Sequence, residues 1–285
     1  MTELRGKPVA DNITAKASER IEELKSKGIN PKLAVIRVGA RPDDLAYERG
    51  IIKRFETAGC DYEVFELPED CTQEDLDSCF DARNEDDSIS GILLFRPLPK
   101  HLSGNYIRSA VNPDKDIDCM GLYNQASLFV GTKKAYAPCT AQAVMELIHY
   151  YGIDLTGKRV TVVGRSLVIG KPVSLMLMAD NATVTICHTR TKDLPEELKK
   201  ADIIVASAGS AKMITGDMVS PGQIIIDVGM NNDEDGKLGG DVDYEAASAI
   251  VDSITPVPGG VGAVTTSVLL QNTVEGAARL NNGKL

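Results

Sequence analysis

Short apolar runs of strand length alternate with stretches of helical periodicity along the whole chain of 285 residues. This alternation is typical of parallel sheets whose strands are connected by helices packed on the sheet faces. One early stretch has helical spacing, because Ile13, Ala17, Ile21 and Leu24 recur on one face and Gly28 follows as a stop signal. We therefore predict an α/β fold with strands at 33–38, 62–67, 91–94, 159–163, 182–187, 203–206, 224–228 and 253–257.

The length favours two domains, at roughly 150 residues per domain. Val144, Leu147 and Ile148 lie on one face of a helix expected over 140–151, and we place the joint between two sheet systems there. A last apolar helix is expected over 266–280. The predicted fold is two α/β domains: residues 1–145 plus 268–285, and a Rossmann-type doubly wound parallel sheet in residues 146–267.

Composition narrows the class of protein. No apolar run approaches the roughly 20 residues of a membrane span, and the first residues lack the apolar stretch of a secretory signal, so we expect a cytoplasmic protein without a membrane partner. A net charge of −10 without a basic tract argues against a nucleic-acid partner and favours a small-molecule substrate. The six cysteines include no Cys-x-x-Cys pair, so we expect free thiols and no metal site.

A turn containing two glycines follows the predicted strand at 159–163. Residues 160–172 read Val-Thr-Val-Val-Gly-Arg-Ser-Leu-Val-Ile-Gly-Lys-Pro, which puts Gly164 and Gly170 between a strand and a helix start. A phosphate can meet free backbone N–H groups and the positive end of a helix dipole at such a place. The glycine spacing is wider than in G-x-G-x-x-G, so a plain tight turn explains the motif equally well.

The residues after the next predicted strand bear on the choice of cofactor. An NAD enzyme usually carries Asp or Glu there to bind the ribose, whereas an NADP enzyme presents a cation. Here the residues are His188, Thr189, Arg190 and Thr191, without a carboxylate. Arg165 and Arg190 could both bind a 2′-phosphate through charge-assisted hydrogen bonds, although Arg190 could equally be a solvated loop charge. This pattern predicts NADP as the cofactor.

Seven short motifs are spread from the middle of the chain toward its end. They are Pro-Leu-Pro at 97–99, Lys-Asp-Ile-Asp at 115–118, Pro-Cys-Thr at 138–140, Gly-Arg-Ser at 164–166, Asp-Val-Gly at 227–229, Gly-Gly-Asp-Val-Asp at 239–243 and Thr-Pro-Val-Pro-Gly-Gly-Val-Gly at 255–262. In sequence and order they resemble the methylenetetrahydrofolate dehydrogenase/cyclohydrolase family. The resemblance implies a folate-binding first domain, a cofactor-binding Rossmann domain, a cleft between them for the reacting carbon, and a homodimer.

The resemblance also assigns roles to individual residues. Asp118 resembles the acid that binds the pterin ring and Tyr47 the tyrosine that lines this site, so both are the implied catalytic residues; a turn cap after Pro113 is the alternative for Asp118. The implied substrate contacts are Tyr47, Phe95, Pro97, Leu98, Asp118, Pro258, Gly259 and Gly260. The implied cofactor contacts are Gly164, Arg165, Ser166, Gly170, His188, Thr189, Arg190, Gly209 and Thr255.

The departures from the family pattern gather on the substrate side. Ile51 stands where the family has its catalytic lysine, and Phe95 where it has a glutamine. The other departures are Asp44 for a serine, Arg96 for an apolar residue, Cys119-Met120 for Gly-Phe, and Ala263-Val264 for Pro-Met.

On a helix starting near Pro42, Tyr47 and Ile51 stack at i and i+4. Leu45, Ile52 and Phe55 are expected to form the core-facing stripe beside them. Lys53 is about 200° from Ile51 around this helix, so it is expected to be a surface lysine rather than a substitute.

Three functions remain open. The leading hypothesis is an NADP-dependent methylenetetrahydrofolate dehydrogenase with weak or absent cyclohydrolase activity, because hydride transfer needs no general base whereas hydrolysis does. The second is an intact bifunctional enzyme in which another group, such as Asp44 or Arg96, orients water. The third is a cofactor-binding protein with a regulatory or assembly role. The presence of Tyr47 and Asp118 argues against this third hypothesis.

Overall fold

The computed structural model describes residues 1–132, 134–232 and 238–284. Its contacts divide the chain into two compact units: unit 1 is Met1–Ala10 with Thr140–Thr265, and unit 2 is Asp11–Cys139 with Thr266–Leu285. The divisions fall within or at the ends of helices α1 (Gly6–Ser26), α6 (Cys139–Tyr150) and α10 (Gly262–Leu280). The expected boundaries at 145 and 267 lie within a few residues of two of these divisions, whereas the first ten residues group with unit 1 and not with the first expected domain.

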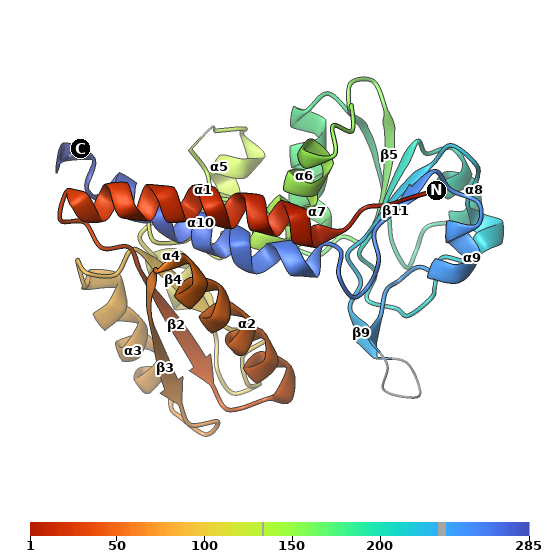
Figure 1. The fold of residues 1–285 in the computed structure, drawn as a ribbon. Helices are drawn as coiled ribbons and strands as arrows, with labels where there is room; N and C mark the ends of the chain where they lie inside the picture. The colour runs from red at the N-terminus through yellow and green to blue at the C-terminus, as the bar shows by residue number, and fades with distance from the viewer. Residues whose placement is uncertain (133, 233–237, 285) are drawn as a thin grey trace. The chain divides into compact units, whose positions relative to one another are not determined.

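Unit 1 is built on a six-stranded sheet in the order β1-β11-β8-β7-β5-β6, in which each neighbouring pair is parallel. Its strands are β1 (Thr2–Glu3), β5 (Arg159–Val163), β6 (Thr183–Cys187), β7 (Ile203–Ala206), β8 (Ile224–Asp227) and β11 (Ser253–Ile254). Helices α6 and α7 (Gly170–Ala179) lie on one face, and α8 (Leu194–Lys199) and α9 (Tyr244–Ser248) on the other (Figure 1). The predicted doubly wound parallel sheet is confirmed.

Burial on both faces explains why the central strands of this sheet read as continuous apolar runs. All four residues of β7 are buried, as are the last four residues of β5. The chain passes from β5 to its neighbour β6 and then returns across β5 to β7, on the opposite side. The carboxyl ends of β5 and β7 therefore form a topological switch point, where open α/β sheets bind their ligands.

Unit 2 contains a three-stranded parallel sheet in the order β3-β2-β4. Its strands are β2 (Lys32–Val38), β3 (Asp61–Leu67) and β4 (Gly91–Leu94), and its further helices are α2 (Pro42–Ala58), α3 (Gln73–Glu85), α4 (Asn105–Ala110) and α5 (Leu122–Phe129). Fully buried Phe55 and Phe80 bring α2 and α3 into the core. Helices α1 and α10 lie side by side (Figure 1), with the hydroxyl oxygens of Thr14 and Ser267 3.2 Å apart.

The predicted strands agree with the structure to within one residue at each end, apart from the last. We expected that strand over 253–257, but β11 ends at Ile254 because the chain then enters a loop with two prolines, which cannot donate ladder hydrogen bonds. The closing helix begins at Gly262 rather than at 266.

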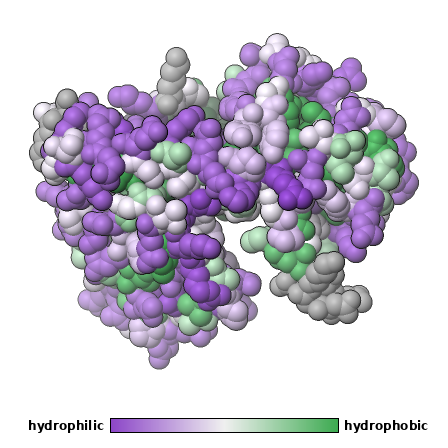
Figure 2. Space-filling view, viewed as in Figure 1, coloured by the Kyte–Doolittle hydropathy of each residue, from purple (hydrophilic) through white to green (hydrophobic). Residues whose placement is uncertain are grey.

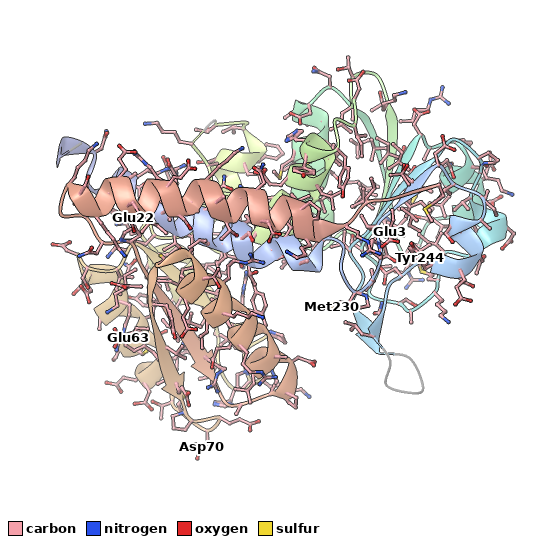
Figure 3. The ribbon with its side chains drawn as sticks, viewed as in Figure 1. Glu3, Glu22, Glu63, Asp70, Met230 and Tyr244 are labelled. Carbon is pink, nitrogen blue, oxygen red and sulfur yellow. The ribbon has the colours of Figure 1, made fainter. Side chains whose placement is uncertain are left out.

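Several short elements were not predicted. They are β1, β9 (Asn231–Asn232), β10 (Leu238–Gly239), and the 3-10 turns at Gly216–Met218 and Asn282–Lys284. Strand β1 pairs with β11, and Glu3 on β1 lies close to Tyr244 at the start of α9 (Figure 3). A strand of two residues carries no periodicity, so only its pairing reveals it.

The surface is mostly hydrophilic on the face drawn in Figure 2, with smaller hydrophobic patches. All six cysteines are free thiols, as predicted. Among the described residues, no helix has the length and apolar character needed to cross a membrane.

Candidate active site

The turn after β5 is shaped by two glycines. Gly164 has a φ of 134°, and a Cβ added to it would lie 2.4 Å from the carbonyl oxygen of Ser207, directly after β7. A Cβ on Gly170 would lie 2.3 Å from the carbonyl oxygen of Gly164. Only glycine fits at either position, and the turns after β5 and β7 therefore approach each other closely at the switch point.

Ser166 and Arg165 occupy the same turn. The Ser166 hydroxyl accepts hydrogen bonds from the amides of Ile169 at 3.0 Å and Gly170 at 3.4 Å, at the start of helix α7. Ser166 therefore orders the turn, while the exposed Arg165 side chain remains available to solvent or a ligand. The Ser166 hydroxyl thereby satisfies two of the amides at the start of α7.

A compact turn follows β6, the strand next to β5. The His188 amide donates to Thr191 Oγ1 at 2.8 Å, and the Arg190 amide donates to His188 Nδ1 at 3.1 Å. The side chains of Thr189 and Arg190 are exposed. Neither the Arg190 nor the Arg165 guanidinium has a partner within the part of the chain that the structure describes. Because β5 and β6 are parallel neighbours, both cations follow strands that end at the same edge of the sheet.

The loop after β7 is held by a carboxylate that the sequence reasoning did not single out. Asp241 is fully buried, and its Oδ2 accepts hydrogen bonds from the amides of Ala208 and Gly209, the second at 3.1 Å. Its Oδ1 accepts from Ser210 N and Asn231 Nδ2, both at 2.9 Å. The amide of the predicted cofactor residue Gly209 is therefore already hydrogen-bonded to Asp241. The Gly-Gly-Asp-Val-Asp motif, which contains Asp241, was the feature of the sequence that could have pointed to this residue.

Thr255 is a buried residue of unit 1 whose hydroxyl binds the backbone of Asp227. Its Oγ1 accepts from the Asp227 amide at 2.7 Å and donates to the Asp227 carbonyl at 3.3 Å, and the residue is fully buried. The predicted cofactor contact of Thr255 is therefore not through a free hydroxyl.

The carboxyl of Asp227 has a raised pKa. Burial raises the pKa of this carboxyl to about 6, although hydrogen bonds from backbone amides lower it.

The loop after β11 contains the predicted residues Pro258, Gly259 and Gly260. A Cβ on Gly260 would lie 2.5 Å from the Pro256 carbonyl oxygen, and the Gly259 carbonyl accepts a hydrogen bond from Gly6 N at 2.8 Å. The loop is thus anchored to the start of α1 and belongs to unit 1. The other predicted substrate residues belong to unit 2.

Asp118 is the centre of a polar cluster in unit 2. Its Oδ1 accepts the amide of Cys139 at 2.9 Å, and its Oδ2 accepts Nη2 of Arg96 at 2.9 Å. The Asp118 side chain is 17% exposed, so one side of the carboxylate remains open. The amide of Cys139 comes from the start of α6, which no pattern in the sequence linked to Asp118.

Two aromatic rings lie beside this cluster. The ring centroids of Tyr47 and Phe95 are 5.7 Å apart and tilted by 36°. Burial raises the pKa of the Tyr47 phenol well above its usual value, and nearby Cys139 and Asp118 raise it further, so the phenol stays neutral. The structure therefore brings Tyr47, Phe95 and Asp118 together as predicted candidates.

The other two predicted substrate residues follow directly along the chain. Pro97 and Leu98 line an open pocket, whose remaining residues are Glu69, Asp70, Pro99, Lys100 and His101. Asp70 lies at the end of unit 2 that β3 points to (Figure 3).

Helix α2 positions the residues that depart from the family pattern. Ile51 is fully buried, on a stripe with Glu48, Phe55 and Ala58. The predicted stripe of Leu45, Ile52 and Phe55 was wrong in two members, since Leu45 and Ile52 are only half-buried. The reason is a buried ion pair: Glu48 Oε2 lies 2.8 Å from Nε of Arg37 on β2, which turns this polar residue inward. Lys53 is exposed, as predicted.

Asp44, a candidate for orienting water, already has a partner. Both of its carboxylate oxygens accept hydrogen bonds from Arg41, at 2.8 and 2.9 Å. The Asp44 carboxylate is therefore already engaged in a bidentate ion pair with Arg41.

Comparison with known proteins identifies relatives over nearly the full length. Residues 4–118 match the family model of the tetrahydrofolate dehydrogenase/cyclohydrolase catalytic domain, and residues 138–281 match that of the NAD(P)-binding domain. A protein named bifunctional protein FolD from Carboxydothermus hydrogenoformans is 52% identical over 280 residues, 98% of each chain.

Two solved structures resemble the fold closely. The bifunctional FolD methylenetetrahydrofolate dehydrogenase/cyclohydrolase of Campylobacter jejuni superposes with a TM-score of 0.95 at 41% identity, covering 98% of this chain and 99% of that one. The corresponding enzyme of Trypanosoma brucei, complexed with NADP and an inhibitor, has a TM-score of 0.93 at 35% identity and covers 98% of both chains.

Proposed function

We propose that this chain, which belongs to the tetrahydrofolate dehydrogenase/cyclohydrolase family, is an NADP-dependent 5,10-methylenetetrahydrofolate dehydrogenase of one-carbon metabolism. One observation carries the choice of cofactor: the turns after the neighbouring strands β5 and β6 present two exposed guanidiniums and no carboxylate at the same edge of the sheet. Assembly as a homodimer is part of the proposal and rests on family membership alone.

The residues of unit 1 fit a dinucleotide phosphate. Gly164 and Gly170 allow the backbones of the turn after β5 and of its neighbours to approach closely, and Ser166 orders the start of α7. Arg165 and Arg190 would hold the 2′-phosphate, because a guanidinium gives charge-assisted hydrogen bonds to phosphate oxygens. NADP supplies the hydride acceptor when it is bound, and the protein supplies binding and orientation.

The residues of unit 2 fit a pterin ring. The open side of the Asp118 carboxylate would accept N–H groups from the ring edge, while Tyr47 and Phe95 would contact its face. Pro97 and Leu98, next along the chain, would extend this contact. Hydride transfer requires close alignment and no proton transfer, so this set of residues is sufficient for the oxidation.

The second family reaction, hydrolysis of the methenyl product, requires proton transfers. Ile51 cannot carry a proton, Phe95 cannot donate a hydrogen bond, and Asp44 is held by Arg41. We therefore propose cyclohydrolase activity that is weak relative to the dehydrogenase. The names of the relatives favour the second candidate, a fully bifunctional enzyme, in which Arg96 would orient water.

The two candidates differ in what accumulates. Purified protein is mixed with methylenetetrahydrofolate and NADP, and reduced cofactor and methenyl product are followed at separate wavelengths. Accumulation of the methenyl compound in step with reduced cofactor supports the first candidate. Opening of added methenyltetrahydrofolate as fast as it is formed supports the second. No reduction of NADP would contradict both.

A further inference from the structure

Arg96 is the chain neighbour of Phe95 and the ion-pair partner of Asp118, two residues of the proposed folate site. It directly follows Phe95, beyond the carboxyl end of β4, and its Nη2 lies 2.9 Å from Asp118 Oδ2. The arginine side chain is 34% exposed, so the ion pair is open to solvent on one side. An ion pair this exposed contributes little to folding stability, so stability alone does not account for an arginine here.

The hydrogen-bonding capacity of the pair is only partly used. A carboxylate offers about four acceptor positions, and Asp118 uses one for the Cys139 amide and one for Arg96. A guanidinium offers five N–H donors, of which the Asp118 bond uses one. The pair therefore presents unused acceptor positions on Asp118 directly beside unused donors on Arg96.

A 2-amino-4-oxopyrimidine, the polar edge of a pterin, has the complementary pattern. Its amino group and ring N–H are two adjacent donors, and the 4-oxo group beside them is an acceptor. We propose that Arg96 is a specificity-determining residue that donates to the 4-oxo group while Asp118 accepts the two N–H groups. This proposal rests on the folate-binding function proposed above and extends it to a residue outside the family pattern.

The chemistry predicts a particular discrimination. A 4-amino pterin presents an N–H donor where the 4-oxo compound presents an acceptor, so it would point a donor at the Arg96 donors. It also lacks the ring N–H that Asp118 would accept, so the share due to Arg96 is the difference between the wild type and Arg96→Leu. Loss of one charge-assisted hydrogen bond corresponds to a change of about tenfold or more in affinity. Arg96 should therefore favour the 4-oxo compound by at least that factor.

The test measures dissociation constants of tetrahydrofolate and of 4-amino-4-deoxytetrahydrofolate by calorimetry for the wild type, Arg96→Leu and Arg96→Lys. Arg96→Leu should weaken tetrahydrofolate about tenfold or more and change the 4-amino compound little. Arg96→Lys should retain part of the preference, because an ammonium still donates but lacks the fork geometry. The KM for methylenetetrahydrofolate should rise with the dissociation constant.

Arg20→Leu is the matched control, since Arg20 also forms an exposed ion pair with a carboxylate, that of Glu23, in the same unit. Equal weakening of both pterins in Arg96→Leu, or no weakening of either, would overturn the assignment. The thermal midpoint and the NADP affinity of each variant exclude misfolding as the cause. If the wild-type protein binds NADP but neither pterin, the result would instead contradict the proposed function itself.

Discussion

The carboxylate of Asp241 holds the amide of Gly209: the two lie 3.1 Å apart, and the same carboxylate binds the flanking amides of Ala208 and Ser210. A side chain 32 residues further along the chain thereby shapes the loop after β7. Since this loop touches the Gly164 turn at the switch point, the bond links a buried carboxylate to cofactor binding.

We expect Asp241→Asn to weaken both folding and NADP binding. The new amide would point an N–H group at backbone N–H donors, and a buried donor or acceptor left unsatisfied costs about 1–3 kcal/mol. Thermal unfolding and NADP titration measure the two effects. Asp243→Asn, in the same segment, is the control: Asp243 caps α9, and Asn caps equally well. Identical behaviour of the two variants would contradict the role of Asp241.

Arg165→Ala should lower the affinity for NADP far more than that for NAD. Loss of a charge-assisted contact to the 2′-phosphate corresponds to about tenfold or more in affinity. Dissociation constants for both cofactors measure this. Arg159→Ala, at the opposite end of β5, should leave both constants unchanged. Equal losses for NADP and NAD in Arg165→Ala would show that Arg165 does not read the 2′-phosphate.

Asp118→Ala should weaken tetrahydrofolate binding by about tenfold to a hundredfold, because it removes charge-assisted acceptors from the pterin edge. NADP binding should be nearly unchanged, because Asp118 belongs to unit 2 and the proposed cofactor residues belong to unit 1. The folate affinity of Asp118→Asn should lie between those of the wild type and Asp118→Ala, since asparagine keeps one acceptor oxygen. Titration with each ligand measures this, and an unchanged folate affinity would remove Asp118 from the site.

The double variant Ile51→Lys with Phe95→Gln should raise the hydrolysis rate more than the dehydrogenase rate. Positioned general acid-base groups contribute about 10² to 10⁴-fold, so an increase of at least tenfold is expected. Ile51→Lys alone should lower the unfolding temperature, because Ile51 is fully buried and its new ammonium would lack a partner. Asp44 complicates the test, since it could pair with the new lysine and hold it charged, which would leave the lysine a poor base.

The control for this variant is Ile52→Lys with Phe95→Gln, since Ile52 is half-buried and lies on a different side of α2. Loss of added methenyltetrahydrofolate is the measurement. If the unmodified protein already opens this compound as fast as it makes it, another residue activates the water and the prediction is wrong.

Stability should also depend on pH through Asp116. Burial raises the pKa of this carboxyl to about 6, although Asn124 and the amides of Met120 and Gly121 lower it. Between about pH 4 and pH 6 the folded protein therefore holds a proton that the unfolded chain has released, so this group's contribution to stability is lost as the pH rises. The loss amounts to about 2 to 3 kcal/mol.

Denaturant unfolding of the wild type and Asp116→Asn across this pH range isolates the effect. The variant lacks the titrating group, so the wild type should lose stability relative to it as the pH rises. Parallel curves for the two proteins would contradict the raised pKa.

The sequence by itself determined the features that depend on local pattern. Apolar runs predicted the central strands of both sheets, because a strand buried on both faces must be apolar along its length. Gly164 and Gly170 marked the tight turn after β5, since only glycine permits such close backbone approach. The family motifs predicted Tyr47, Phe95 and Asp118 as candidates, which the structure brings together in unit 2.

Tertiary structure alone decided the contacts between residues distant in the chain. Strand β1 is too short for a periodic pattern and exists only through its pairing with β11. Glu48 is polar, and it faces inward only because Arg37 on β2 neutralises it. Arg96 meets Asp118, and Asp241 meets Gly209, across separations of 22 and 32 residues. Such contacts depend on the three-dimensional path of the backbone, which the periodicity of any one segment does not contain.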